Sequence, residues 1–448
     1  MRKIVVVSVA AALCAMWVES AVAGQVQGGA AQHPQEYRHY EGPPVTLTAL
    51  LQEAAARNPS LSALRQQADV IRKRPAQERG LNPPMAEAQI WQWPINSINP
   101  ANTNMYMFMV SQELPGRGKR DLRVAVAEKD VALAENDVAL RARQITNEIK
   151  QAYATLFIAR KAIDVHLESV DLLRQIADIA HAKYSTGRIS QQDVLKPIVE
   201  LSTLHNDIIM FDEQANLAAA RLNTLLDRAP ETPLGPLVDP REEALLPATA
   251  EIQRIAIEQQ PELIRARLDV ERAEAELALA RREYKPDFSV QGGYMVTPHM
   301  TDAWLGSVAI SWPRAPWSRG KIDARVAEQT AGVEAARARA RAMENDVRLA
   351  VQEAYVRAKA AQERAALLRT TILPQSQQTL EVSRVAYQSD RVDFQALIDS
   401  ERMLLASRLD YFRALSDFNQ AIADLERAVG SDLPAGTVAD VAIQETGR

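Results

Sequence analysis

Residues 119–186 read KRDLRVAVAEKDVALAENDVALRARQITNEIKQAYATLFIARKAIDVHLESVDLLRQIADIAHAKYST and contain neither glycine nor proline. Gly118 and Gly187 flank the stretch. Because glycine and proline are the residues that most often end helices, the stretch predicts one uninterrupted helix. At about 1.5 Å per residue, such a helix is on the order of 100 Å long, whereas the average globular helix has about 11–12 residues.

Apolar residues recur every seven positions in this stretch and predict a coiled-coil seam, because a 3.5-residue repeat keeps one side turned to a neighbouring helix. One row is Ile149, Leu156, Ile163, Val170 and Ala177, and its companion is Ala152, Ala159, His166, Leu173 and Ala180. The register returns later with Val351, Ala358, Ala365 and Ile372 beside Ala354, Ala361 and Leu368. We interpret His166 as a packed or edge-hydrated seam residue in preference to a metal ligand.

The helix belongs to a motif that occurs twice. The matching positions are Pro59 and Pro261, Gly118 and Gly320, Arg123 and Arg325, Tyr153 and Tyr355, and, after a one-residue slip, Tyr184 and Tyr387. Unrelated residue types that keep one offset over most of a chain predict an internal repeat. We therefore predict a first repeat at 45–230, a linker at 231–250, a second repeat at 251–430 and a C-terminal tail at 431–448.

Each repeat also contains a segment that predicts a β-hairpin. The strands are expected at about 85–93 and 105–114, and at about 287–295 and 304–312. Each has about nine or ten residues, the length of a tilted membrane strand, and apolar residues alternate with polar ones. Tryptophans near the strand ends suit a membrane interface, and they are Trp91, Trp93, Trp304 and Trp312. A small soluble hairpin packed on the helices is the alternative.

Four strands are too few for a membrane barrel, which must close on itself and uses about eight strands or more in bacteria. Two copies of the chain would supply eight strands and three copies twelve, so this arithmetic leaves the copy number open. A pair of very long helices also cannot bury both flanks alone. The predicted fold is therefore mainly α with a membrane β-barrel, built by an oligomer from two helix-strand-strand-helix repeats per chain.

The N-terminus predicts export. Arg2 and Lys3 precede an apolar run, and Ala21 and Ala23 form a small-residue cleavage site, so residues 1–23 are expected to be a signal peptide and 24–44 an extended arm. The only cysteine, Cys14, lies within the signal and follows Leu13 instead of a small residue, so lipidation is not predicted. The formal net charge is −5, with both signs spread along the helices, which gives nucleic-acid binding little support.

Taken together, these features resemble the TolC-type outer-membrane efflux proteins over about 45–430. The most specific segments are YSTGRISQQDVL at 184–195 and YQSDRVDFQALID at 387–399. The segment SQELPGRGKRDLR at 111–123 is most similar to the heavy-metal branch. The resemblance implies a homotrimer in the Gram-negative outer membrane, with a twelve-stranded barrel that contacts lipid and continues into a periplasmic tunnel of twelve helices. It also implies a periplasmic adaptor and an inner-membrane pump, most simply of the RND type.

The resemblance further implies two sets of functional residues. The turns that would dock the adaptor contain Tyr184, Gly187, Arg188, Ser190, Tyr387, Asp390, Arg391 and Asp393, and helix capping is the alternative role for the polar ones. Asp399 matches an acidic residue that narrows the family's entrance, whereas Ala396 stands where a second acid is usual. Asp193 also matches the family pattern. We further hypothesise that Lys196 pairs with an acidic residue and helps to hold the entrance closed.

No catalytic set or cofactor motif is found, so we do not predict an enzyme. Four methionines lie in the first hairpin, at Met85, Met105, Met107 and Met109. They are soft-metal ligands in principle, but apolar filling is the commoner role of methionine. The resemblance therefore implies a passive exit channel, for heavy-metal cations or small toxic compounds. A soluble periplasmic coiled-coil scaffold or adaptor is the alternative function.

Overall fold

The structure is a computed structural model, and it describes residues 42–99, 102–240, 243–244, 248–298, 300–389, 391–433 and 436–437. The expected signal peptide at 1–23, most of the extended arm, and Asp390 lie outside these residues, as do parts of the expected linker and C-terminal tail.

The order of elements repeats, as the sequence predicts. The first half contains α1 (Leu47–Arg57), α2 (Pro59–Ile71), α3 (Arg74–Arg79), β1 (Met85–Trp91), β2 (Met105–Leu114), α4 (Lys119–Ser185) and α5 (Gln191–Leu225). The second contains α6 (Thr249–Gln259), α7 (Pro261–Arg282), β4 (Phe288–Val296), β5 (Ala303–Ile310), α8 (Pro316–Leu367), α9 (Leu373–Gln388) and α10 (Phe394–Val429). Two short strands, β3 (Glu243–Ala244) and β6 (Gly436–Thr437), pair with each other.

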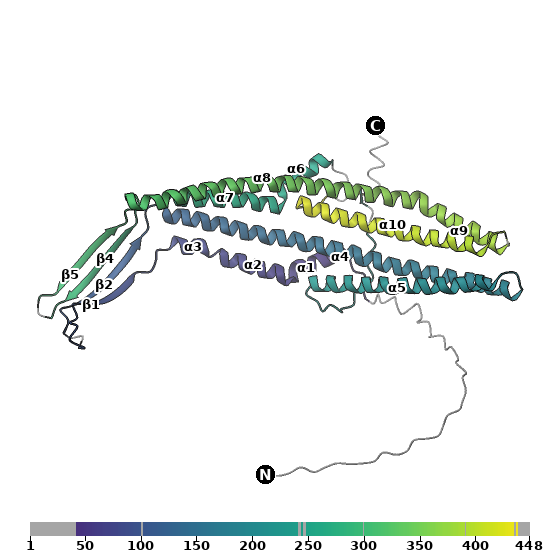
Figure 1. The fold of residues 1–448 in the computed structure, drawn as a ribbon, viewed down its shortest axis with the longest axis horizontal. Coiled ribbons are helices and arrows are strands. Elements are labelled where there is room, and N and C mark those ends of the chain that lie inside the picture. Colours follow the sequence, from purple (N-terminus) through teal and green to yellow (C-terminus); the bar gives the residue numbers. More distant parts are fainter. Residues whose placement is uncertain are drawn as a thin grey trace, which may run out of the picture. The chain divides into compact units, whose positions relative to one another are not determined.

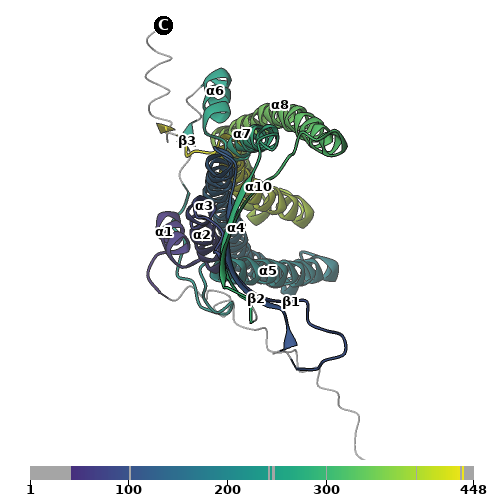
Figure 2. The same cartoon turned by 90° about the vertical axis from the view of Figure 1, so that its left-hand side faces the viewer.

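The long helix α4 organises the packing. It has 67 residues, as its lack of glycine and proline predicts. The helices α2, α3, α5, α7 and α10 all pack along it, and α8 packs on α7 and α10 (Figure 1). The view along the helices shows them gathered around α4 (Figure 2). Within the described residues, no helix combines the length and apolar character needed to cross a membrane.

The predicted seam is the core of this helical part. On α4, Ile149, Leu156, Ile163 and Val170 are almost completely buried, as is His166, whose ring packs against Phe211 at a centroid distance of 5.1 Å. The matching residues of the second half are buried as well, apart from the partly buried Ile372. The 3.5-residue pattern therefore identified the packed face correctly, and Ala177 alone in the first half is only partly buried.

The repeat extends to individual hydrogen bonds. Asn58 precedes Pro59 at the start of α2, and its Nδ2 donates to the carbonyl of Leu225 at 2.9 Å. At the matching place Gln260 precedes Pro261, and its Nε2 donates to the carbonyl of Arg427 at 3.1 Å. Proline suits the first turn of a helix because its missing N–H has no helical partner there. Each half thus ties the start of its second helix to the end of its last one.

The four long strands form one antiparallel sheet in the order β1-β2-β4-β5. The register places alternate residues on two different faces. One face is apolar and carries Ile90, Tyr106, Phe108, Val110, Val290, Tyr294, Trp304, Val308 and Ile310. The opposite face carries Glu87, Gln89, Trp91, Met107, Ser111, Gln291 and Ser307. The alternation inferred from the sequence is confirmed.

The strand ends differ from the predicted ones. The first strand was expected to reach Trp93 but ends at Trp91, because Gln92 has φ = +59°, a conformation that breaks the extended backbone. The last strand was expected to reach Trp312 but ends at Ile310. Trp312 instead begins a turn in which its carbonyl accepts the Ala315 N–H at 3.2 Å. Trp93 and Trp312 therefore lie beyond the paired strands.

One irregularity was not predicted. A π-helical turn at Leu368–Ile372 joins α8 to α9, and Pro374 lies in the first turn of α9. Proline lacks an N–H and its ring crowds the carbonyl four residues earlier, so a wider turn before it relieves both problems.

Candidate functional site

The two turns singled out by the sequence lie together. The α4–α5 turn and the α9–α10 turn line one groove, with Gly187, Arg188 and Ser190 from the first and Arg391 and Asp393 from the second. Lys183, near the end of α4, bridges them. Its Nζ donates to the Tyr387 carbonyl at 2.5 Å and lies 4.1 Å from the centre of the Tyr387 ring. Because α4 starts directly after the sheet and ends at this turn, the groove lies at the opposite end of α4 from the strands.

The first turn is built around Gly187, which has φ = +73°. Glycine adopts this left-handed conformation at little cost, and the Gly187 N–H reaches the Tyr184 carbonyl at 2.9 Å. Ser190 then precedes α5, and its Oγ donates to Asp193 Oδ2 at 2.9 Å. No heavy atom lies within 4 Å of where a Cβ on Gly187 would stand, so the outer side of the turn is open.

The second turn is held by a different set of contacts. Asp393 caps α10, where its Oδ1 accepts the Ala396 N–H at 2.9 Å. The Arg391 N–H donates to the Ala386 carbonyl at 2.9 Å. Asp390, expected in this turn, lies outside the described residues.

The two repeated tyrosines are not equivalent in their surroundings. Tyr387 is 2% exposed and packs edge-on against Phe394 at 5.9 Å, whereas Tyr184 is 43% exposed. Tyr387 therefore supports the turn from within, and Tyr184 is the tyrosine that remains on the surface.

The residues expected at the entrance lie in the first two turns of α5 and α10. The Asp399 side chain is 58% exposed, accepts Gln395 Nε2 at 2.9 Å and lies 4.0 Å from Arg402 Nη1. Asp193 lies 3.5 Å from Lys196 Nζ on the same helix. Lys196 therefore pairs with Asp193, which lies three residues earlier on the same helix.

Sequence reasoning missed the cross-helix bridge closest to these residues. Arg402 on α10 donates through Nε to Glu200 on α5 at 2.9 Å, and through Nη2 to the other carboxylate oxygen at 2.5 Å. No local pattern in the sequence gave a signal for this pair, because it joins two helices from different repeats.

Beside this bridge lies a second missed residue, Glu401, which is 2% exposed. Burial raises the pKa of Glu401, and the charge of Glu200 raises it further. A hydrogen bond with Ser169 on α4 and the charges of Arg402 and Arg408 oppose that rise. A buried carboxyl group therefore lies within a few residues of the expected entrance.

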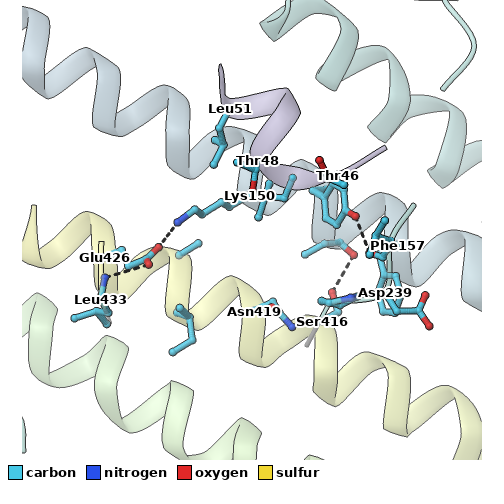
Figure 3. A pocket seen from close by; sticks show the side chains of 17 residues that line it. Thr46, Thr48, Leu51, Lys150, Phe157, Asp239, Ser416, Asn419, Glu426 and Leu433 are labelled. Atoms are coloured by element: carbon cyan, nitrogen blue, oxygen red, sulfur yellow. Dashed lines mark hydrogen bonds and ion pairs between the residues drawn. The ribbon is translucent and has the colours of Figure 1, made fainter. Parts of the chain in front are cut away.

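A separate pocket lies midway along α4, between α1, α4 and α10 (Figure 3). Lys150 pairs with Glu426, whose Oε1 also accepts the Leu433 N–H at 3.3 Å. Tyr153 donates to the Val238 carbonyl at 2.7 Å, and burial raises its pKa to about 12. These contacts join the segments around Val238 and Leu433 to α4 and α10, so the pocket lies where several segments pack together.

The four tryptophans occupy different environments. Trp304 lies on the apolar face of the sheet, 5.0 Å from the Tyr294 ring, and is 83% exposed. Trp91 ends β1 on the opposite face, as the partner of Met105. Trp312 packs edge-on against Trp317 at 6.1 Å. Their expected place at a membrane interface remains a prediction. Among the described residues, no group of three or more His, Cys, Asp or Glu side chains is arranged to hold a metal ion.

The sequence of this chain is similar to sequences of known proteins. The sequence profile of the family described as outer membrane efflux protein matches residues 50–228. The cobalt-zinc-cadmium resistance protein CzcC of Cupriavidus metallidurans is 23% identical over 391 residues, covering 86% of this chain and 90% of the relative.

Solved structures share the fold. The outer-membrane channel OprN has a TM-score of 0.74 at 19% identity, covering 86% of this chain and 90% of its own. VceC from Vibrio cholerae has a TM-score of 0.72 at 17% identity, with 87% and 97% covered. CusC has a TM-score of 0.73 at 16% identity, with 88% and 96% covered.

Proposed function

Because the chain belongs to the TolC-type outer membrane efflux proteins of Gram-negative bacteria, we propose that it is the exit duct of a tripartite efflux system. Three copies form the duct, and it works with a periplasmic adaptor and an inner-membrane pump of the RND type. Conduction through the duct is passive, and the pump supplies the energy. In this role the chain itself catalyses no reaction.

The observation that carries this proposal is the sheet. β1 and β5 each have one strand neighbour within the described residues, so both outer edges of the sheet can pair further. Most exposed large apolar side chains of the strands lie on one face, among them Phe108, Val308 and Ile310, whereas Met85 and Trp91 lie on the other. A face of this kind suits lipid, and open edges suit closure with other copies. Three copies supply twelve strands, enough for a closed barrel with the apolar face outward.

The helical part supports the same assembly. α5 exposes Leu195, Ile198 and Val199, and α9 exposes Val382 and Val385. Apolar side chains that a single copy leaves in water are stabilised when a neighbouring copy covers them, at about 25 cal/mol per Å² of apolar surface buried. We place these flanks of α5 and α9 at the contacts between copies.

We assign the entrance to the first two turns of α5 and α10. Three Asp399 side chains, one from each copy, would form an acidic ring that favours cations. Asp193 and Lys196 lie at the matching depth on α5. The outer surface of the two turns, with Tyr184, Gly187, Arg188, Ser190, Arg391 and Asp393, is the proposed docking surface for the adaptor. Its open side at Gly187 and its exposed polar groups suit a helical hairpin of the partner.

Heavy-metal cations are the proposed substrate class, supported by the name of the relative CzcC. The test is growth of a metal-sensitive Gram-negative host that carries the adaptor and pump with or without this chain. Restored tolerance to cobalt, zinc or cadmium is expected. If the host instead gains tolerance to organic toxins and its metal tolerance does not change, the substrate class is small toxic compounds and not metals.

The channel itself is tested in planar lipid bilayers with the purified trimer. Discrete cation-selective conductance is expected, and Asp399→Asn should move the reversal potential in a salt gradient toward zero because the acidic ring loses its charge. If the Asp399→Asn channel conducts with unchanged cation selectivity, Asp399 does not line the entrance. The scaffold alternative predicts release with the periplasmic fraction and no conductance, whereas the duct stays with detergent-extracted outer membrane.

A further inference from the structure

The strand methionines lie on the polar face of the sheet. Met105, Met107 and Met109 alternate along β2, so all three project from the face opposite Phe108 and Val110. The register adds Met295 on β4, which stands directly opposite Met107. Apolar filling does not by itself explain this placement, because most other large apolar residues of the strands lie on the opposite face, with Trp91 and Leu305 among the exceptions.

Several cross-strand neighbours of these methionines are polar, although Trp91 stands opposite Met105 and Ala303 opposite Met295. Gln89 on β1 is the other cross-strand partner of Met107, and Glu87 is that of Met109. On the β4 side, Gln291 Nε2 lies 3.2 Å from the Met109 sulfur. The thioethers of Met107 and Met109 therefore lie beside polar groups that suit a water-filled channel.

The spacing brings thioethers within reach of one another. Directly opposed residues of antiparallel strands have Cβ atoms about 4.5–5.5 Å apart, so the flexible side chains of Met107 and Met295 can meet on one ion. Met105 and Met109 follow at about 7 Å on either side along β2. A cation that leaves Met107 and Met295 can therefore bind next to Met105 or Met109, two residues away along β2.

We propose that Met105, Met107, Met109 and Met295 form a thioether stripe that transiently binds soft monovalent cations, Cu⁺ or Ag⁺, in the channel lumen. The inference rests on the proposed function, which turns the polar face of the sheet toward the lumen. Thioethers prefer soft cations such as Cu⁺ to harder divalent ions. The Glu87 carboxylate beside Met109 adds attraction for positive charge. Several weak sites in series suit conduction, because an ion must leave as easily as it enters.

The test measures single-channel current in planar bilayers with nitrate electrolyte, since chloride would precipitate silver. Micromolar Ag⁺ is expected to reduce the current of the unaltered trimer. The double variant Met107→Leu/Met295→Leu keeps the side-chain volume but removes both sulfurs. Loss of a partner that merely supports a metal ligand costs about tenfold or more in affinity, so the silver midpoint should rise by at least that factor. Current in silver-free solution reports that each variant is folded.

Two controls separate thioether binding from other effects. Met210→Leu alters an exposed methionine on α5, outside the stripe, and should leave the silver midpoint unchanged. Zn²⁺ at the same concentration should leave the current nearly unchanged. Equal block by Zn²⁺ would assign the effect to carboxylates and overturn the proposal, as would an unchanged silver midpoint in the double variant.

Cysteine substitutions separate this inference from the proposed function. The only natural cysteine, Cys14, lies in the predicted signal peptide. A charged methanethiosulfonate reagent should reduce the current of Met107→Cys and leave that of Phe108→Cys unchanged. Normal conductance with an unreactive Met107→Cys would overturn the stripe and leave the channel intact. Absence of conductance in every variant would overturn the proposed function and the stripe with it.

Discussion

Arg402 and Glu200 form a bidentate ion pair between α10 and α5, in which Arg402 Nε lies 2.9 Å from Glu200 Oε1. Both helices pack on α4, and the pair joins them close to their entrance ends. The Glu200 side chain is only 12% exposed, whereas that of Arg402 is 53% exposed. Loss of the arginine would therefore leave a largely buried carboxylate without its main partner.

We predict that Arg402→Ala raises the channel conductance, because α5 and α10 lose the link that holds them together at the entrance. The lost pair is expected to cost about 1–2 kcal/mol, since hydrogen bonds to charged groups are strong but the arginine is half exposed. Single-channel recording and the temperature of trimer dissociation measure the two effects. In the double variant with Glu200→Ala, stability should partly recover while the conductance stays high. Unaltered conductance in both variants would show that the pair does not restrain the entrance.

Lys196 provides a matched comparison, since it lies at the same end of the channel but pairs within its own helix. Its contact with Asp193 spans three residues on a helix surface, and such pairs contribute about 0.2–0.5 kcal/mol. Lys196→Ala should therefore raise the conductance much less than Arg402→Ala in the same recordings. If the Lys196→Ala channel conducts like the unaltered one, the hypothesis that Lys196 holds the entrance shut is wrong.

Glu401 predicts a pH-dependent stability. Its pKa is raised in the folded protein, mainly by burial and then by the charge of Glu200. The folded state therefore binds the Glu401 proton more tightly than the unfolded chain, in which the pKa is about 4.3. The stability contributed by the protonated group is fully present below that value and is lost as the pH rises through the folded pKa.

Glu401→Gln removes this titration and keeps the side-chain shape. The variant is expected to dissociate at a higher temperature than the unaltered trimer at pH 8, and the difference should shrink as the pH falls toward 4.5. Melting curves across this range give the comparison. Because Ser169, Arg402 and Arg408 face the same carboxyl group, a difference that stays constant with pH would mean that lost hydrogen bonds, and not the proton, govern the effect.

The parts of this fold that follow a local period could be predicted from the sequence. The 3.5-residue rows identified the buried side of α4 from Ile149 to Val170, and the two-residue alternation predicted that apolar side chains share one face within each strand. Both patterns depend only on where successive side chains point along a helix or strand. The long helix followed likewise from the absence of glycine and proline between Gly118 and Gly187.

The features that were missed depend on contacts between distant segments. The Arg402–Glu200 pair and the burial of Glu401 arise only when α5, α4 and α10 pack together. The early end of β1 depends on the conformation of Gln92, for which no local pattern gave a signal. The placement of Met295 beside Met107 required the register between strands of different repeats.

The matching hydrogen bonds of Asn58 and Gln260 give a final prediction, because only Asn58 also caps a helix. Asn58 both donates to the Leu225 carbonyl and accepts the Leu61 N–H at 3.2 Å, whereas Gln260 makes only the tie to Arg427 among these contacts. Both side chains are buried. Asn58→Ala should therefore cost about 2–3 kcal/mol, the sum of a lost helix cap and a lost buried bond, and Gln260→Ala about 1 kcal/mol. Gln259→Ala, at an exposed neighbouring position, serves as the control and should leave the melting temperature unchanged. Equal losses for Asn58→Ala and Gln260→Ala would contradict the assigned capping role of Asn58, because the cap is the contact that distinguishes the two sites.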